Sequence, residues 1–114
     1  MAKHIASLSP QYAFMQLRAS MRQGDIQVIQ LYTDPQDFDR THRRLGKSEV
    51  LYYQQLAKHL DKLIAFRGIR WTYPTYSDEN LAVAIVKEGR DEDLWCFRKS
   101  RQGWLYSPHS CSYL

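Results

Sequence analysis

The feature that most constrains this chain is a change in the spacing of its apolar residues at Gly68. Before that glycine, apolar residues recur three and four positions apart, as they do on one face of a helix. After it, they alternate or run together in short segments bounded by turns. Because the helical period and the period of two do not fit each other's geometry, the sequence predicts an α+β fold in which helices precede strands.

Helix signals divide the first part of the chain into three helices. Ser9 can accept hydrogen bonds from the free N–H groups of a first helical turn, and the proline after it fits that turn. A second start follows Gly24, and Ser48 is the strongest capping residue, ahead of a long amphipathic stretch. The helices are predicted at residues 10–23, 26–33 and 49–66. The segment 34–47 is predicted as a weak helix or an ordered loop, with room for a short strand.

Four apolar runs after Gly68 predict strands, and the short polar turns between them predict antiparallel hairpins. The runs cover residues 69–76, 81–86, 94–99 and 104–107. Pro74 favours an edge position for the first, because proline cannot donate to a β-ladder. The second run is apolar throughout, which predicts cover on both faces. The residues expected in the core are Leu17, Leu56, Leu60, Val83, Ile85 and Phe97.

Length and composition indicate a single domain. The chain has 114 residues, 44% of them hydrophobic, which is enough for a core that needs no metal or disulfide. We expect one domain over residues 1–114, with its core in 9–108 and a tail in 109–114.

No cofactor or metal site is predicted. Cys96 lies in an apolar run and is expected in the core, whereas Cys111 lies in the tail. Because the two cysteines lack a CxxC spacing, they predict neither a zinc site nor a disulfide framework. His109 is close to Cys111, but no second pair completes a tetrahedral site. The acidic residues 91–93 are interpreted as part of a turn. The sequence has no glycine-rich phosphate loop.

The charge pattern argues against nucleic acid as a partner. The formal net charge is +4, and the basic residues are dispersed apart from the segment 40–44, which includes Arg40 and Arg44. No apolar run approaches the length of about 20 residues that spans a bilayer. The first ten residues contain no apolar signal-peptide region. The default compartment is the cytoplasm, or the periplasm or exterior if a signal peptide has been removed.

The order of these motifs resembles the nuclear transport factor two-like superfamily, also called the cystatin-like cone fold, in a bacterial type of member. The likeness rests on segments 9–17, 22–25, 31–34, 93–99 and 101–104, the last ending in Gly103-Trp104. The resemblance implies N-terminal helices packed on a strongly curved antiparallel sheet, with a cone-shaped cavity between them. Members usually have about six strand segments, and only four are recognised here.

The resemblance also implies how a catalytic member would work. Isomerases and dehydratases of this fold need a base in the cavity, and the candidates here are Asp34 and His59. Asp34 has another interpretation, because it precedes Pro35 and can cap a helix. His59 follows Lys58 near the polar side of the long helix and can be a solvated residue. The aromatic residues that could wall a ligand cavity or simply fill it are Tyr12, Tyr32, Tyr53, Trp71 and Tyr73.

Three classes of function follow, because relatives of this fold include both enzymes and binding proteins. The first is a non-catalytic module that binds a small apolar or aromatic ligand or forms a homodimer through its sheet, with Trp95 as an apolar anchor if it faces outward. The second is a small isomerase-like or dehydratase-like enzyme that uses a cavity Asp or His. The third is an adaptor that binds an anionic partner through Arg40 to Arg44, since arginine pairs well with carboxylates and phosphates. The first is preferred because no acid–base pair stands out.

Overall fold

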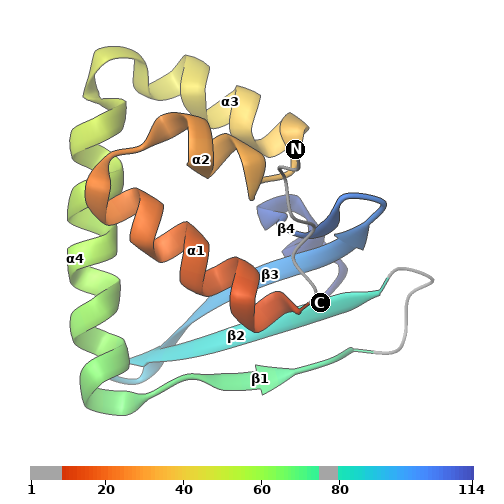
Figure 1. Ribbon diagram of the computed structural model, residues 1–114. Helices are drawn as coiled ribbons and strands as arrows, with labels where there is room; N and C mark the ends of the chain where they lie inside the picture. Colours follow the sequence, from red (N-terminus) through yellow and green to blue (C-terminus); the bar gives the residue numbers. More distant parts are fainter. Residues whose placement is uncertain (1–8, 75–79) are drawn as a thin grey trace.

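The computed structural model describes residues 9–74 and 80–114, apart from the side chain of residue 113. Four α-helices precede a sheet, as the change of period at Gly68 predicts (Figure 1). The helices are α1 (Pro10–Gln23), α2 (Ile26–Leu31), α3 (Pro35–Leu45) and α4 (Glu49–Arg67), with a 3-10 turn, η1 (Gly46–Ser48), before α4. In the described residues, no helix combines the length and the apolar character needed to cross a membrane.

The start and end of α1 follow from its capping residues. Ser9 accepts a hydrogen bond from the N–H of Tyr12, and the helix ends at Gly24, whose φ is +68°. A Cβ atom at Gly24 would lie 2.7 Å from Cγ1 of Val50. The glycine therefore both ends α1 and lets it approach α4 closely.

Segment 34–47 is helical, which is one of its two predicted forms, and it contains no short strand. It forms α3 and part of η1, and Asp34 caps α3 by accepting from the N–H of Gln36 at 3.1 Å. The prediction for Ser48 was wrong. Ser48 makes no capping bond to α4, and its hydroxyl donates instead to the carbonyl of Leu45. The reason is that η1 runs directly into α4, so the backbone at Ser48 is not extended as a capping residue requires.

The sheet is a four-stranded antiparallel meander with strand order β1-β2-β3-β4, as predicted. Its strands are β1 (Arg70–Thr72), β2 (Leu81–Glu88), β3 (Asp91–Ser100) and β4 (Gly103–Tyr106). The predicted first strand, 69–76, ends at residue 72 among the described residues, and 75–76 lie outside them. Residues 91–93, interpreted as a turn, begin β3. In this register Ala84 lies opposite Trp95, and Val83 lies opposite Cys96. Because side chains alternate along a strand, the sheet has an inner face that turns to the helices and an outer face.

The inner face carries the main core. Trp95 and Phe97 project from β3 toward Phe14 of α1, with ring centroids 5.4 and 5.5 Å from that of Phe14. Ala57 and Leu60 of α4 are buried in the same cluster. On the outer face, Val83, Ile85 and Cys96 form a smaller buried cluster against Cys111.

The expected core is largely confirmed. Leu17, Leu60, Val83, Ile85 and Phe97 are buried as predicted. Leu56 is only partly buried, at the edge of the core. The buried stripe of α4 runs through Tyr53, Ala57 and Leu60, so Leu56 lies one position to the side of it.

Trp95 is not the outward anchor that a dimer interface would need. Only 6% of it is exposed, and it stacks on Tyr106 with ring centroids 4.9 Å apart. It shares the inner face with Phe97 because the two residues are two positions apart in one strand.

The expectation of no disulfide was also wrong. Residues Pro108–Tyr113 form a 3-10 helix, η2, and Cys111 within it is bonded to Cys96. The physical reason is the alternation of β3: Cys96 points to the outer face, where the chain returns after β4. Cys96 is nevertheless buried, as predicted.

Candidate functional site

A cavity of about 70 Å³ lies between the helices and the inner face of the sheet. Its walls are mostly apolar or aromatic, with a few polar groups, as in ligand sites. The lining residues come from α1, α2, α3, α4, β3 and β4 and the segments beside them: Leu17, Met21, Ile29, Thr33, Asp37, Thr41, Tyr52, Tyr53, Leu56, Trp95, Tyr106 and Pro108. Asp37 is the one carboxylate among these lining residues.

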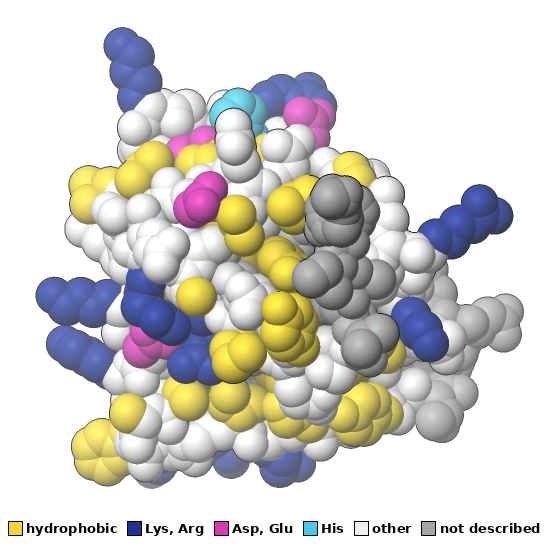
Figure 2. Space-filling model, in the orientation of Figure 1, with side chains coloured by type: hydrophobic (Ala, Val, Ile, Leu, Met, Phe, Trp, Pro, Cys, Tyr) yellow, Lys and Arg dark blue, Asp and Glu magenta, His cyan; other side chains and the backbone are white. Residues whose placement is uncertain are grey.

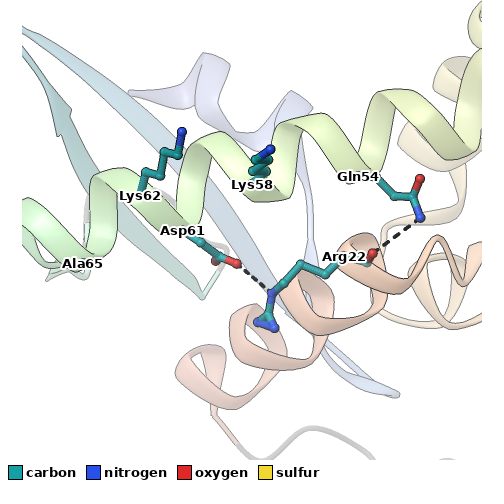
Figure 3. Close-up of a pocket in the computed structure, with 6 residues that line it drawn as sticks. All are labelled: Arg22, Gln54, Lys58, Asp61, Lys62 and Ala65. Atoms are coloured by element: carbon teal, nitrogen blue, oxygen red, sulfur yellow. Dashed lines mark hydrogen bonds and ion pairs between the residues drawn. The ribbon is translucent and has the colours of Figure 1, made fainter.

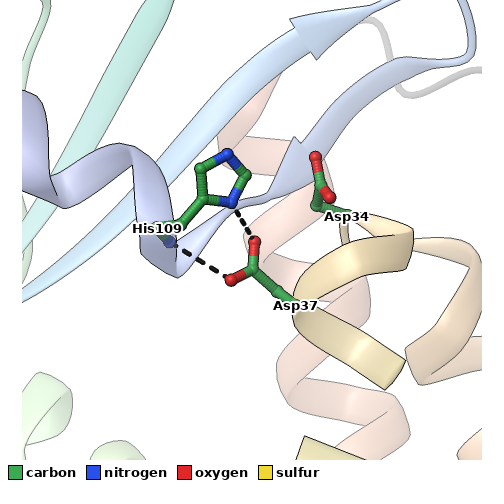
Figure 4. Close-up of side chains that lie close together, drawn as sticks. All are labelled: Asp34, Asp37 and His109. Atoms are coloured by element: carbon green, nitrogen blue, oxygen red, sulfur yellow. Dashed lines mark hydrogen bonds and ion pairs between the residues drawn. The ribbon is translucent and has the colours of Figure 1, made fainter. Parts of the chain in front are cut away.

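Asp37 is held by a histidine that lies 72 positions further along the chain (Figure 4). Oδ2 of Asp37 is 2.6 Å from Nδ1 of His109, and Oδ1 accepts from the backbone N–H of His109 at 3.3 Å. Because an ionised carboxylate can only accept, Nδ1 carries the proton in this bond. The Asp37 side chain is 4% exposed, and Arg40 approaches its Oδ1 to 3.9 Å.

The fold explains why a carboxylate is tolerated at this buried position. Asp37 lies in the first turn of α3, where the helix dipole favours negative charge. His109 reaches it because η2 turns back past the end of β4. Figure 4 shows the two side chains pointing toward each other from α3 and η2.

Asp34, one of the two predicted bases, is engaged elsewhere. Its Oδ2 is 2.5 Å from Nη2 of Arg98, and its Oδ1 caps α3. Burial alone would raise the pKa of Asp34, but the hydrogen bonds from Arg98 and from the N–H of Gln36 outweigh burial and lower this pKa below its usual value. Asp34 is therefore a paired, ionised capping residue and a poor proton acceptor.

Asp34, Asp37 and His109 also raise the question of a metal ion. One ligand atom from each lies within 4.8 Å of the others. Arg98 already neutralises Asp34, however, and a proton joins Asp37 to His109. Each group already has a partner, since Asp34 pairs with Arg98 while Asp37 and His109 pair with each other, so the cluster needs no cation.

His59, the second predicted base, lies outside the cavity. Its Nε2 is 2.9 Å from Oε1 of Glu88, and the two side chains are 53% and 47% exposed. An exposed pair of this kind is a surface interaction of small energetic value.

Of the five predicted wall aromatics, Tyr53 lines the cavity. Tyr32 and Trp71 are half-buried against the core, and Tyr12 and Tyr73 are exposed. The other aromatic residues in the wall are Tyr52, Trp95 and Tyr106.

The buried tyrosine hydroxyls of the site stay protonated at neutral pH. Burial, together with the charge of Glu49, raises the pKa of Tyr53 to about 12. Burial also raises the pKa of Tyr106 well above its usual value. These two groups can act as hydrogen-bond donors toward the cavity, whereas Asp37 is an acceptor.

The basic segment 40–44 is partly used within the fold. Arg43 pairs with Asp39, and the guanidinium of Arg44 lies 5.8 Å from the centre of the Tyr52 ring. The imidazole of His42 is 2.8 Å from Oε2 of Glu49. On the side shown in Figure 2, Lys and Arg side chains stand at separate places around the molecule.

A second, open groove lies between α1 and α4 (Figure 3). Nε of Arg22 is 2.6 Å from Oδ2 of Asp61, and Asp61 also pairs with Arg18. Lys58 and Lys62 project from α4 beside this ion-pair network. The network ties α1 to α4, and the groove itself is a surface hollow.

Sequence reasoning missed both members of the Asp37–His109 pair. Neither residue has a local motif, and 72 positions separate them. One weak indication of the pair is the position of Asp37. It follows the helix start at Asp34-Pro35 by two residues and precedes the apolar Phe38.

The chain matches no known protein family, and no curated protein or solved structure is significantly similar to it.

Proposed function

We propose that this chain is a non-catalytic, cone-fold type of ligand-binding protein, and that its cavity takes a small group bearing a hydrogen-bond donor or a positive charge. The observation that carries the proposal is the buried carboxylate of Asp37 in a mostly apolar and aromatic wall. Helices packed on one face of an antiparallel meander, with a cavity between them, support the cone-fold resemblance.

The size of the cavity restricts what fits. Ligand sites usually measure roughly 300–1,000 Å³, and this cavity measures about 70 Å³. It therefore accommodates one compact group, and the rest of a ligand extends past the half-exposed ring of Tyr52. A primary amine or a hydroxyl on a small apolar frame has the matching chemistry.

The test uses benzylamine and toluene, which have similar shapes but only one of which carries a positive donor group. We expect benzylamine to shift the NMR signals of Trp95 and Tyr53 and toluene to bind more weakly. Asp37→Asn, which keeps the side-chain shape, should weaken benzylamine binding at least tenfold. Asp61→Asn in the open groove is the matched control and should leave binding unchanged. If benzylamine at millimolar concentration shifts neither signal, the aromatic rings fill the cone and the proposal fails.

A second candidate function is proton transfer of the isomerase or dehydratase type. It is favoured by one observation, the 2.6 Å contact between Oδ2 of Asp37 and Nδ1 of His109 beside the cavity. A carboxylate paired with a histidine can accept and relay a proton. Exchange of the α-protons of cyclohexanone in D₂O should then be faster with the protein than in buffer, and Asp37→Asn should abolish the difference. Equal rates would remove this candidate.

A homodimer and an adaptor for an anionic partner have weaker support. The outward anchor of the homodimer is lost because Trp95 is buried, and the basic segment 40–44 is partly paired within the fold.

The disulfide bears on the compartment, since structural disulfides persist in oxidising surroundings. The bond between Cys96 and Cys111 therefore supports a periplasmic or secreted location over the cytoplasmic default.

A further inference from the structure

We propose that the Cys96–Cys111 disulfide is a redox-controlled latch that holds η2 in place, so that His109 stays on Asp37 and Pro108 stays in the cavity wall. This regulation of the cavity rests on the proposed ligand site, whereas the latch itself does not. Breaking the bond should release η2 and open the cavity to water.

The first support is the position of η2. It is a six-residue 3-10 helix that follows β4, and such short helices have little stability of their own. Its covalent attachment is the disulfide on one side, and its hydrogen bonds to α3 are those of His109 with Asp37 on the other. Ser110 is also fully buried, next to the Ser107 hydroxyl at 2.8 Å. Cys111 is thus only two positions along the chain from the histidine that reaches the site.

The second support is a difference in access to the two sulfur atoms. Cys96 is 1% exposed, whereas Cys111 is half-buried at the surface. An external thiol can therefore reach the sulfur of Cys111 more easily. Thiol–disulfide exchange requires such direct attack on one sulfur.

The chemistry balances with a low-molecular-weight thiol as the reductant. An external thiolate attacks Sγ of Cys111, the S–S bond breaks, and Cys96 leaves as a thiolate that takes up a proton. A second external thiolate then attacks the outer sulfur of the mixed disulfide and releases Cys111. Two thiols are oxidised to one disulfide, and the protein disulfide is reduced to two thiols.

The third support is the effect that release would have on Asp37. Its carboxylate is buried and receives two contacts from His109, one from the ring and one from the backbone N–H. A buried carboxylate without those partners needs water in their place. Loss of η2 would therefore bring water to the polar end of the cavity.

The test is hydrogen exchange, followed by mass spectrometry, on the full chain with and without dithiothreitol. We expect exchange in a peptide covering residues 107–114 to become at least tenfold faster on reduction. The labelling times are kept short enough that a peptide covering β2, which exchanges through global unfolding, stays protected in both redox forms. Cys111→Ser should show the fast tail exchange with or without dithiothreitol. Arg90→Ala, an exposed substitution in the turn between β2 and β3, is the control and should keep the redox response.

Two outcomes would overturn the latch. Unchanged tail exchange on reduction would mean that η2 is held without the disulfide. Exchange of β2 at the same short labelling times would mean that reduction unfolds the whole domain and that the bond supports the whole fold. A ¹⁵N spectrum of the His109 imidazole gives a second readout. It should show Nδ1 protonated in the oxidised protein and a change on reduction.

Benzylamine binding to both redox forms tests the regulation separately. We expect at least fivefold weaker binding after reduction, because Pro108 leaves the wall. Equal affinities would reject the regulation. If neither form binds, the proposed ligand site fails, and the exchange data still decide whether the latch exists.

Discussion

The two faces of the sheet are held by different kinds of interaction. The inner face packs Trp95 and Phe97 against Phe14 over a large apolar area. The outer face has a smaller apolar cluster, which is joined by a covalent bond at Cys96. The side chain of Arg98, two positions along the same face, reaches Asp34 at 2.5 Å. Burial of apolar surface is insensitive to pH and to redox state, whereas an ion pair responds to pH and a disulfide to redox state.

Within one sheet, therefore, one face supplies most of the stability, and the other carries the interactions that respond to pH and redox state. The inner face should decide whether the chain folds, and the outer face should decide how tightly α3 and η2 are attached to it. Substitutions on the two faces can therefore distinguish the two roles.

The largest effect is expected on the inner face, from Phe97→Ala. Phe97 is fully buried and contacts the rings of Phe14, Trp71 and Tyr106. Its truncation should lower the free energy of unfolding by about 3–5 kcal/mol, as for other large-to-small core changes. Urea unfolding measures this loss. Phe66→Ala, at a position 85% exposed, should change it by less than about 0.5 kcal/mol. Similar losses in both variants would mean that the inner face is not the main core.

The next effect is expected from Cys111→Ser on the outer face. The disulfide closes a loop with a sequence separation of 15 residues, and a loop of this length is worth about 3 kcal/mol. Urea unfolding without reductant should show that Cys111→Ser is less stable than the wild type by this amount. Adding dithiothreitol should not lower the stability of the variant further. A loss above that of Phe97→Ala would reverse the ranking of the two faces.

The smallest effect is expected from Asp34→Asn, which removes the charge that pairs with Arg98. Asparagine caps helices about as well as aspartate, so the change tests the ion pair and leaves the cap. At pH 7 it should cost about 1.5–3 kcal/mol, the usual range for a hydrogen bond to a charged group.

The pH dependence of that cost has a definite sign. The pKa of Asp34 is lowered in the folded protein, so the native state binds this proton less readily than the unfolded chain, whose ordinary pKa is 3.8. The stabilisation is therefore complete above about pH 4 and is lost as the pH falls through the folded pKa. The difference between wild type and Asp34→Asn should shrink in urea titrations from about pH 7 to about pH 2. A difference that stays constant would show that charge is not its source.

Much of the fold could be predicted because it depends on local patterns. The period change at Gly68 and the capping signals at Ser9 and Asp25 determine where elements begin, and the structure confirms those elements. The face of Trp95 could also have been predicted: Phe97 was assigned to the core, and residues two apart in a strand share a face.

The site and the disulfide could not be predicted in the same way, because they depend on tertiary placement. Asp37 and His109 meet only after η2 turns back past β4, and Cys96 meets Cys111 on the face that η2 covers. Sequence spacing carries no information about such a return. Asp34 shows the converse, since its capping role is local and was one of its two predicted interpretations.

The segment between α2 and α3 has one more consequence, for contacts between molecules. Thr33 forms a parallel bridge with Tyr106 of β4, and two backbone hydrogen bonds of 2.8 Å join Asp34 to Tyr106 and Tyr106 to Tyr32. At Tyr106 the edge of β4 is thus occupied by the chain itself, and the opposite edge strand, β1, is three residues long. Open strand edges are where proteins add foreign strands and aggregate. In the described residues, the sheet therefore offers little edge for a neighbouring copy to extend.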